Sequence, residues 1–188
     1  WFIEMLNNAF NKRIMNQVTN NILMIKPISF RYNEQTAINN YYQRVLNNLS
    51  QDLVQARALQ EFNNFVNILE NAGVNVIVVK DTNQFDTPDS IFPNNWISFH
   101  SDGKVGIYPM CAKNRRHERR EDILELLIKH YGFDIKLIKD FSKSEKNEKY
   151  LEGTGSMVLD RENKICYAAI SIRTNQELVQ QFCNVFGY

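Results

Sequence analysis

Hydrophobic and polar positions along the chain predict three stretches of mixed helix and strand. The first stretch has an apolar strand at Ile22 to Ile25, helical sequence from about Ala37 to Asn71, and a β-branched strand at Val74 to Val79. One helical face is expected to be buried, through Leu59, Phe62, Val66 and Leu69. Gly73 can adopt the left-handed backbone conformation that ends a helix, and we expect the strand after it to be buried.

The second stretch begins with two strands joined by a turn. Trp96 to His100 and Val105 to Tyr108 predict a hairpin, and Arg119 to His130 predicts a helix. The apolar face of that helix consists of Ile123, Leu124, Leu127 and Ile128. Gly132 then precedes a strand, Phe133 to Ile138, whose alternation predicts half burial.

The third stretch repeats the order of hairpin, helix and glycine. Strands are predicted at Ser156 to Leu159 and at Ile165 to Ile170. The following helix has an apolar face made of Leu178, Val179, Phe182 and Phe186, and Gly187 ends it. By this pattern a strand should follow Gly187. Because repeats bury their core by stacking, we expect an incomplete repeat architecture.

Composition favours one globular domain in a reducing compartment. The 188 residues include 22 Lys and Arg against 21 Asp and Glu, so a general nucleic-acid-binding surface is not expected. Three cysteines cannot form a closed disulfide framework, which favours a cytoplasmic location. We expect no membrane partner, because no apolar run reaches the length of a membrane span. Residues 1–15 have no secretory-signal pattern and are expected to be an N-terminal extension, with Met15 an alternative start.

Three polar clusters lie at junctions between strands and loops. The segment FDTPDSIFPNNW, residues 85–96, crowds Asp and Asn side chains into a proline-containing loop, which is either a binding loop or a hydrogen-bonded turn. NRRHERR, residues 114–120, could bind a carboxylate or phosphate, although a solvated helix start is the favoured interpretation. In LEGTGS, residues 151–156, small glycines beside Glu152 would let a ligand or another backbone approach closely.

The cysteines and histidines do not identify a reaction centre. Cys166 and Cys183 are expected in the core, and Cys111 lies in a loop without an obvious base nearby. The histidines show no metal-ligand spacing with one another or with a cysteine. Neither a metal site nor a nucleophile–base pair follows from these residues.

Taken in order, five segments resemble the guanidino-group-modifying enzymes of the pentein superfamily. They are ILMIKPISF, FDTPDSIFPNNWISFH, NRRHERR, LEGTGSMVLDR and SIRTN. The branch most similar is that of the arginine-deiminase-related citrulline hydrolases. The resemblance implies an α/β propeller of ββαβ units, of which residues 16–188 would form about three of five as an incomplete catalytic domain. It implies neither a metal nor an organic cofactor.

The resemblance also implies roles for individual residues. Asp89 matches an aspartate that binds substrate nitrogens, and Glu152 matches the acidic residue that engages the substrate and steadies the catalytic histidine. Arg115 and Arg173 match arginines that hold the substrate's α-carboxylate. Asn95 stands where dimethylarginine hydrolases and deiminases carry an aspartate. An amide offers both a donor and an acceptor to a ureido group, which favours citrulline as the substrate.

The implied enzyme hydrolyses citrulline to ornithine, carbon dioxide and ammonia by cysteine covalent catalysis. The family's histidine and cysteine are expected beyond Tyr188, so we expect the isolated chain to be inactive. One alternative is an arginine deiminase, dimethylarginine hydrolase or amidinotransferase activity on a guanidino substrate. Another is a non-catalytic protein that binds an amino acid. The sequence leaves the oligomeric state open.

Overall fold

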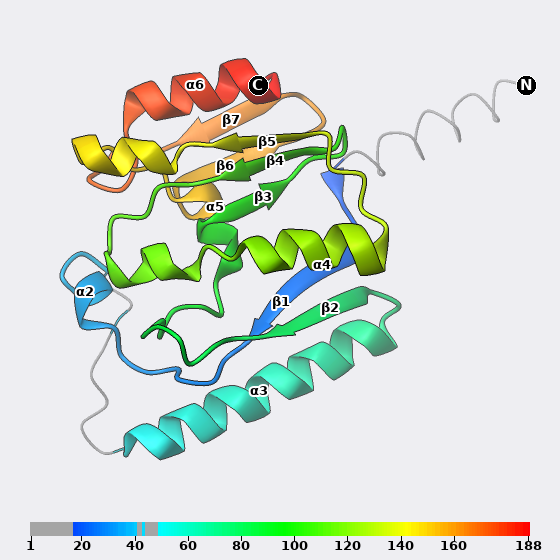
Figure 1. Cartoon of the computed structure of the whole chain (residues 1–188), viewed down its shortest axis with the longest axis vertical. Coiled ribbons are helices and arrows are strands. Elements are labelled where there is room, and N and C mark those ends of the chain that lie inside the picture. The colour runs from blue at the N-terminus through cyan, green and yellow to red at the C-terminus, as the bar shows by residue number, and fades with distance from the viewer. Residues whose placement is uncertain (1–16, 41–42, 44–48) are drawn as a thin grey trace, which may run out of the picture.

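The computed structural model describes residues 17–40, 43 and 49–188. The predicted extension over residues 1–15 therefore lies outside the described residues. Within the described residues, the strands form three separate sheets and no closed sheet, in a mixed α/β fold (Figure 1). None of the helices in this part of the chain is both long and apolar enough to cross a membrane.

The first sheet pairs β1 (Asn21–Lys26) in parallel with β2 (Asn75–Lys80). Helix α3 (Gln51–Asn71) connects them and lies beneath the sheet in Figure 1. The Ser50 side chain accepts a hydrogen bond from the Leu53 backbone N–H (3.3 Å) and so caps the helix. Phe62 and Val66 are buried as predicted, and Leu59 and Leu69 are half-buried.

The predicted helix from Ala37 to Asn71 is wrong at its beginning. A short helix, α2 (Glu34–Ala37), starts after Asn33, whose side chain accepts from the Gln35 backbone N–H (3.1 Å). It ends at the position where the longer helix was expected to begin. Polar caps, which the apolar spacing does not register, set both helix starts.

The second sheet has the order β3 (Ile97–Phe99), β4 (Lys104–Ile107), β5 (Leu137–Asp140). β3 and β4 are antiparallel, whereas β4 and β5 are parallel and joined through α4 (Glu121–Tyr131). Ile123, Leu124 and Leu127 of α4 pack into a core with residues of β1 to β4. Ile128, predicted on the same face, is 46% exposed, because it lies at the margin of that face.

Two strand predictions are also corrected, one for where β5 begins and one for how completely β2 is buried. β5 begins at Leu137, not at Phe133, because its partner β4 begins at Lys104, which is paired with Leu137. Leu137 and Ile138 are nearly half exposed at the edge of their sheet. In β2, Ile77 is buried but Val78 is 38% exposed, since only one face of the two-stranded sheet packs into the core.

The third sheet is the antiparallel pair β6 (Met157–Asp160) and β7 (Ile165–Ala168). Helix α6 (Gln176–Phe186) covers it through a second core that also contains Tyr108 and Phe141, and Figure 1 shows this helix at the top of the molecule. Leu178, Phe182 and Phe186 are buried, as the helical spacing predicted. Cys166 and Cys183 pack against the same core and are half-buried.

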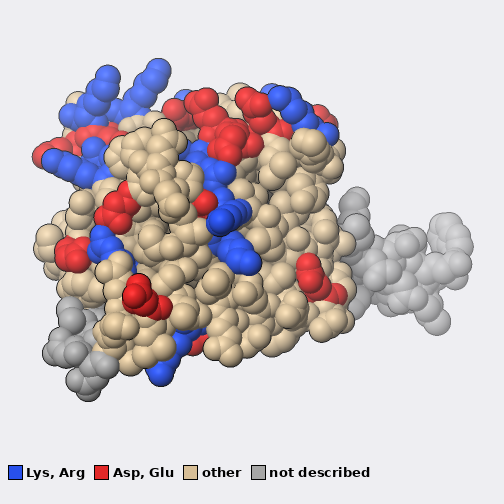
Figure 2. All heavy atoms as spheres, turned by 60° about the horizontal axis from the view of Figure 1, so that its bottom comes forward, with Lys and Arg blue, Asp and Glu red and all other residues tan. Residues whose placement is uncertain are grey.

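Charged side chains of both signs are distributed over the surface. On the face in Figure 2, the Lys and Arg side chains lie among Asp and Glu side chains, and much of the area is neutral. This mixture agrees with the nearly equal totals of 22 basic and 21 acidic residues.

Candidate functional site

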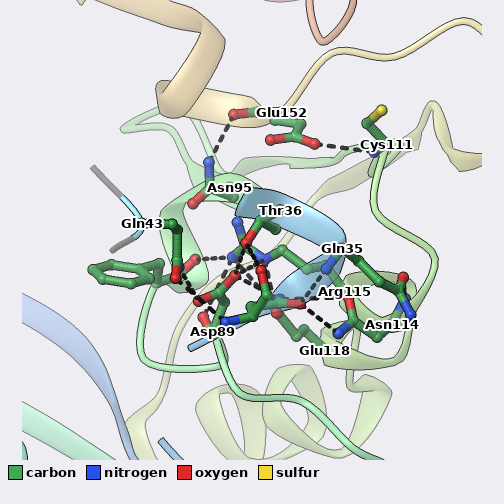
Figure 3. Close-up of polar contacts among 12 residues, drawn as sticks. Gln35, Thr36, Gln43, Asp89, Asn95, Cys111, Asn114, Arg115, Glu118 and Glu152 are labelled. Atoms are coloured by element: carbon green, nitrogen blue, oxygen red, sulfur yellow. Dashed lines mark hydrogen bonds and ion pairs between the residues drawn. The ribbon is translucent and has the colours of Figure 1, made fainter. Parts of the chain in front are cut away.

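The polar residues singled out in the sequence come together because they follow the ends of strands. Residues 33–39 follow β1, Asp89 follows β2, Arg115 follows β4, Glu152 follows β5 and Arg173 follows β7. β1 and β2 are parallel, as are β4 and β5, so the segments after the two members of each pair leave the sheet at the same edge. Chain connectivity therefore converts widely spaced motifs into one cluster (Figure 3).

Asp89 lies at the buried centre of this cluster. Its Oδ2 accepts hydrogen bonds from Asn33 Nδ2 (2.7 Å) and Thr36 Oγ1 (3.0 Å), and its Oδ1 accepts from Gln43 Nε2 (3.1 Å). Arg115 Nε lies 4.0 Å from Asp89 Oδ2. The FDTPDSIFPNNW segment is therefore more than a self-contained turn, because its aspartate joins the segment after β1 to the segment after β4.

The arginines of NRRHERR do not form a solvated helix start, so that favoured interpretation is wrong. They lie in and after the 3-10 helix η2 (Asn114–Glu118), and each has an acidic partner. Arg115 binds Glu118, Arg116 and Arg119 contact Glu145, and Arg120 binds Asp122. A run of like charges is tolerated here because every guanidinium is paired with a carboxylate, two of them with Glu145.

The Arg115–Glu118 pair is buried and bidentate. Arg115 Nε and Nη2 each donate to one oxygen of Glu118 at 2.8 Å. Burial raises the pKa of the Glu118 carboxyl to about 7, although the Arg115 guanidinium opposes this shift. Burial alone would lower the pKa of Arg115, but the charge and hydrogen bonds of Glu118, together with the charges of Asp89 and Glu152, outweigh it and raise that pKa. Arg115 is thus held charged, with its guanidinium plane fixed.

Glu152 and Arg173 form the second part of the site. Arg173 Nη1 donates to Glu152 Oε2 (3.2 Å), and the backbone N–H of Cys111 donates to Glu152 Oε1 (3.0 Å). Arg173 also donates from Nε to Asn39 Oδ1 (2.8 Å) and from Nη2 to the Thr36 carbonyl (3.1 Å). These two donors orient the Glu152 carboxylate. The residue is also buried, which strengthens both hydrogen bonds.

The glycines beside Glu152 admit another part of the backbone. Glu152 precedes a single helical turn, α5 (Gly153–Ser156), which packs against the 3-10 helix η1 (Pro93–Asn95). A Cβ on Gly153 would lie 2.3 Å from the Asn94 carbonyl oxygen, and one on Gly155 would lie 2.1 Å from Asn95 Nδ2. The close approach expected from the sequence is therefore made by η1.

Asn95 is positioned by this contact. Its Nδ2 donates to the Glu152 carbonyl oxygen at 3.5 Å, and Figure 3 shows Oδ1 pointing away from Glu152. Asn95 borders two neighbouring clefts of about 330 and 210 Å³. Glu152 and Arg173 line the larger cleft, and Asp89, Arg115 and Arg173 line the smaller one. All five predicted site residues therefore surround one connected polar region.

Other side chains of this region were not predicted as site residues. They are Asn33, Thr36, Asn39, Gln43 and Glu118, which hold the predicted residues in place. The first four belong to a polar stretch without a recognisable motif, and their role depends on the parallel pairing of β1 with β2. The signal for Glu118 was its position as the single acid within a run of basic residues.

Cys111 is a poor candidate for a nucleophile in this arrangement. Burial and the Glu152 carboxylate raise the pKa of its thiol, which disfavours the thiolate that attacks carbon. Among the described residues, no group of three or more His, Cys, Asp and Glu side chains is placed to hold a metal ion.

Comparison with solved structures identifies proteins with a similar fold. The N-terminal domain of ArgZ, a cyanobacterial arginine dihydrolase, in covalent complex with a reaction intermediate, matches at a TM-score of 0.62 and 17% identity, covering 89% of this chain and 54% of that one. A Pseudomonas aeruginosa dimethylarginine dimethylaminohydrolase variant complexed with citrulline matches at a TM-score of 0.58 and 18% identity, covering 89% and 56%. The chain thus spans about half of these structures, and 20% of the chain in the apo structure of ArgZ.

The sequence itself matches one family model. No curated protein matches the chain significantly. A family model described as N,N dimethylarginine dimethylhydrolase, eukaryotic, matches residues 26–188, which contain every predicted site residue. The chain therefore belongs to the N,N dimethylarginine dimethylhydrolase family, within the pentein superfamily of hydrolases that modify guanidino groups.

Proposed function

We propose that this chain provides the amino-acid-binding part of a hydrolase that cleaves a C–N bond in the guanidino group of arginine or a methylated arginine. The observation that carries the proposal is the placement of buried Glu152 on a cleft of about 330 Å³, beside the smaller cleft that Arg115 lines. A free arginine derivative has a carboxylate at one end and a cationic group at the other. The Glu152 carboxylate on the larger cleft and the Arg115 guanidinium on the neighbouring one complement these two ends.

Each charged or hydrogen-bonding group of such a substrate is assigned a residue of this chain. Arg115 and Arg173 hold the α-carboxylate, and Asp89 accepts from substrate nitrogens. Glu152 engages the guanidinium, whose N–H donors and positive charge suit a carboxylate. Its fixed position, through the N–H of Cys111 and the Arg173 guanidinium, supports an orienting role.

The proposed chemistry is covalent catalysis. A cysteine thiolate attacks the guanidino carbon, a histidine protonates the departing nitrogen, and the same histidine then activates the water that hydrolyses the intermediate. We propose neither the described cysteines nor the described histidines for these two roles. The proposed architecture is a propeller, supported by the repeated order of hairpin, helix and following glycine in the second and third stretches.

A second candidate substrate is citrulline, and Asn95 is the observation that favours it. A neutral ureido group needs both a donor and an acceptor from the protein, which an amide provides. In this structure Asn95 Nδ2 faces the Glu152 carbonyl, and Oδ1 is directed elsewhere. Nδ2 carries a second N–H, so an amide held in this way can still donate to a ureido oxygen and accept at Oδ1 from a ureido N–H.

Calorimetric binding of L-arginine, NG-methyl-L-arginine and L-citrulline to the chain tests the proposal. Binding is the readout because it does not depend on the expected cysteine and histidine. Replacing Arg173 with Gln should weaken the affinity for whichever of these amino acids binds roughly thirtyfold, about 2 kcal/mol. The reason is that Glu152 and the ligand's α-carboxylate both lose a charged donor. Replacing the exposed Arg57 of α3 with Gln is the matched control and should leave the affinity unchanged. If the unaltered chain binds none of the three amino acids, the proposed binding function is wrong.

Replacing Asn95 with Asp distinguishes the two candidate substrates. An added carboxylate should strengthen binding of L-arginine roughly tenfold and weaken binding of L-citrulline, since only the guanidinium carries a positive charge. The neighbouring exposed Asn94, changed to Asp, introduces the same charge without lining either cleft. Equal changes for both ligands, or the same change with the Asn94 variant, would show that Asn95 does not select between them.

A further inference from the structure

Resting on the proposed function, we infer that Glu118 is a positioning residue for substrate binding, because it fixes the Arg115 guanidinium so that the remaining donors face the ligand carboxylate. Glu118 lines neither cleft among the described residues, so it would act through Arg115. It is one of the most deeply buried acids in the region, with a side chain 1% exposed.

The hydrogen bonds of Arg115 account for its orientation. Its Nε donates to Glu118 Oε1 and its Nη2 donates to Glu118 Oε2, both at 2.8 Å. Nη2 also approaches the carbonyl oxygens of Asp89 (3.4 Å) and Phe92 (3.3 Å). Three of the five guanidinium N–H groups are therefore engaged by oxygen atoms of the protein.

The two N–H groups on Arg115 Nη1 remain available to a ligand, because the contacts above use only Nε and Nη2. Within the described part of the chain, Nη1 donates no hydrogen bond, and Arg115 lines the cleft of about 210 Å³ together with Arg173. A guanidinium is rigid and planar, so fixing Nε and Nη2 also fixes the direction of Nη1. Glu118 thus orients the two Nη1 donors of Arg115 toward the cleft, although Glu118 itself does not line it.

Charge strengthens the case for a positioning role over a merely structural one. An apolar or amide side chain could fill the space behind Arg115, but neither would give two short, charge-assisted hydrogen bonds in one plane. Asp89 is a weaker orienting group, because its nearest oxygen lies 4.0 Å from Arg115 Nε and already accepts from Asn33 and Thr36.

Changing the protein and the ligand together tests the inference. L-Arginine and agmatine differ in the α-carboxylate, which agmatine lacks. Glu118→Gln should weaken L-arginine binding roughly tenfold, measured by calorimetry, and change agmatine binding less than about twofold. Glu118→Asp, which keeps the charge, should restore part of the lost affinity. Glu125→Gln, which removes an exposed carboxylate of α4, should change neither affinity.

A double variant separates positioning from a general loss of structure. If Glu118 acts through Arg115, adding Glu118→Gln to Arg115→Gln should leave the arginine-to-agmatine affinity ratio unchanged. Equal weakening of both ligands by Glu118→Gln, or a further change of the ratio in the Arg115→Gln background, would overturn the inference. Should Glu118→Gln fail to fold, the Glu118→Asp variant provides the same comparison, and it should weaken L-arginine binding more than agmatine binding. Binding of neither ligand by the unaltered chain would instead contradict the proposed function.

Discussion

Replacing Gly153 with Ala should lower the free energy of unfolding by about 2–5 kcal/mol. The Gly153 backbone has a φ of 46°, and its added Cβ would lie 2.3 Å from the Asn94 carbonyl oxygen and 3.0 Å from that of Asn95. These neighbours are backbone atoms, so the clash cannot be relieved by rotating a side chain. Urea unfolding followed by circular dichroism measures the loss.

Gly132 provides the matched control for this substitution. It also has a positive φ, of 68°, but no atom lies within 4 Å of its added Cβ. Gly132→Ala should therefore cost only the left-handed backbone strain, about 1–2 kcal/mol. A Gly153→Ala variant no less stable than Gly132→Ala would contradict the close packing of α5 on η1. Because Asn95 belongs to η1, the Gly153 variant should also weaken ligand binding.

Acidification should destabilise the chain by up to about 3 kcal/mol through His100. Burial, reinforced by the positive charge of Arg161, lowers the pKa of the His100 imidazole to about 4. The unfolded chain has an ordinary histidine pKa near 6.5 and so binds more protons between these values. Stability contributed by neutral His100 is therefore complete above about pH 6.5 and is lost as the pH falls toward 4.

Side-chain contacts explain why His100 stays neutral. Arg161 Nη1 lies 3.4 Å from His100 Nδ1, which must accept, and Ser98 Oγ lies 2.9 Å from Nε2. The ring also packs against Phe186 of α6 in a tilted arrangement, with the two ring centroids 4.2 Å apart. A protonated imidazole would direct an N–H at the guanidinium inside an aromatic cluster.

Urea unfolding at pH 7.5 and pH 4.5 tests this pH dependence. The His100→Gln variant should lose less stability than the unaltered chain between the two pH values, because its side chain does not titrate. Comparing each protein with itself removes the packing cost of the substitution. Equal losses in both proteins would assign the acid sensitivity to other groups.

Several elements were predictable because their signals are local. The apolar face of α6 and the glycines that end α4 and α6 depend on residues within a few positions of one another. Strand ends were less predictable, since β5 begins where β4 offers a partner and not where its own alternation begins. Residues such as Asn33 and Thr36 carry no local signal, because their partner Asp89 is more than 50 positions away.

The sequence by itself determined the order of hairpins and helices and, through the ordered motifs, the resemblance to the pentein superfamily. It also identified Asp89, Asn95, Arg115, Glu152 and Arg173 as candidates, because their motifs are short and contiguous. Only the tertiary structure decided what each of them contacts. Parallel strands deliver their following segments to one edge, where burial pairs Arg115 with Glu118 and Glu152 with Arg173. Buried charges require such partners, and the partners' identity depends on chain topology, which local sequence does not encode.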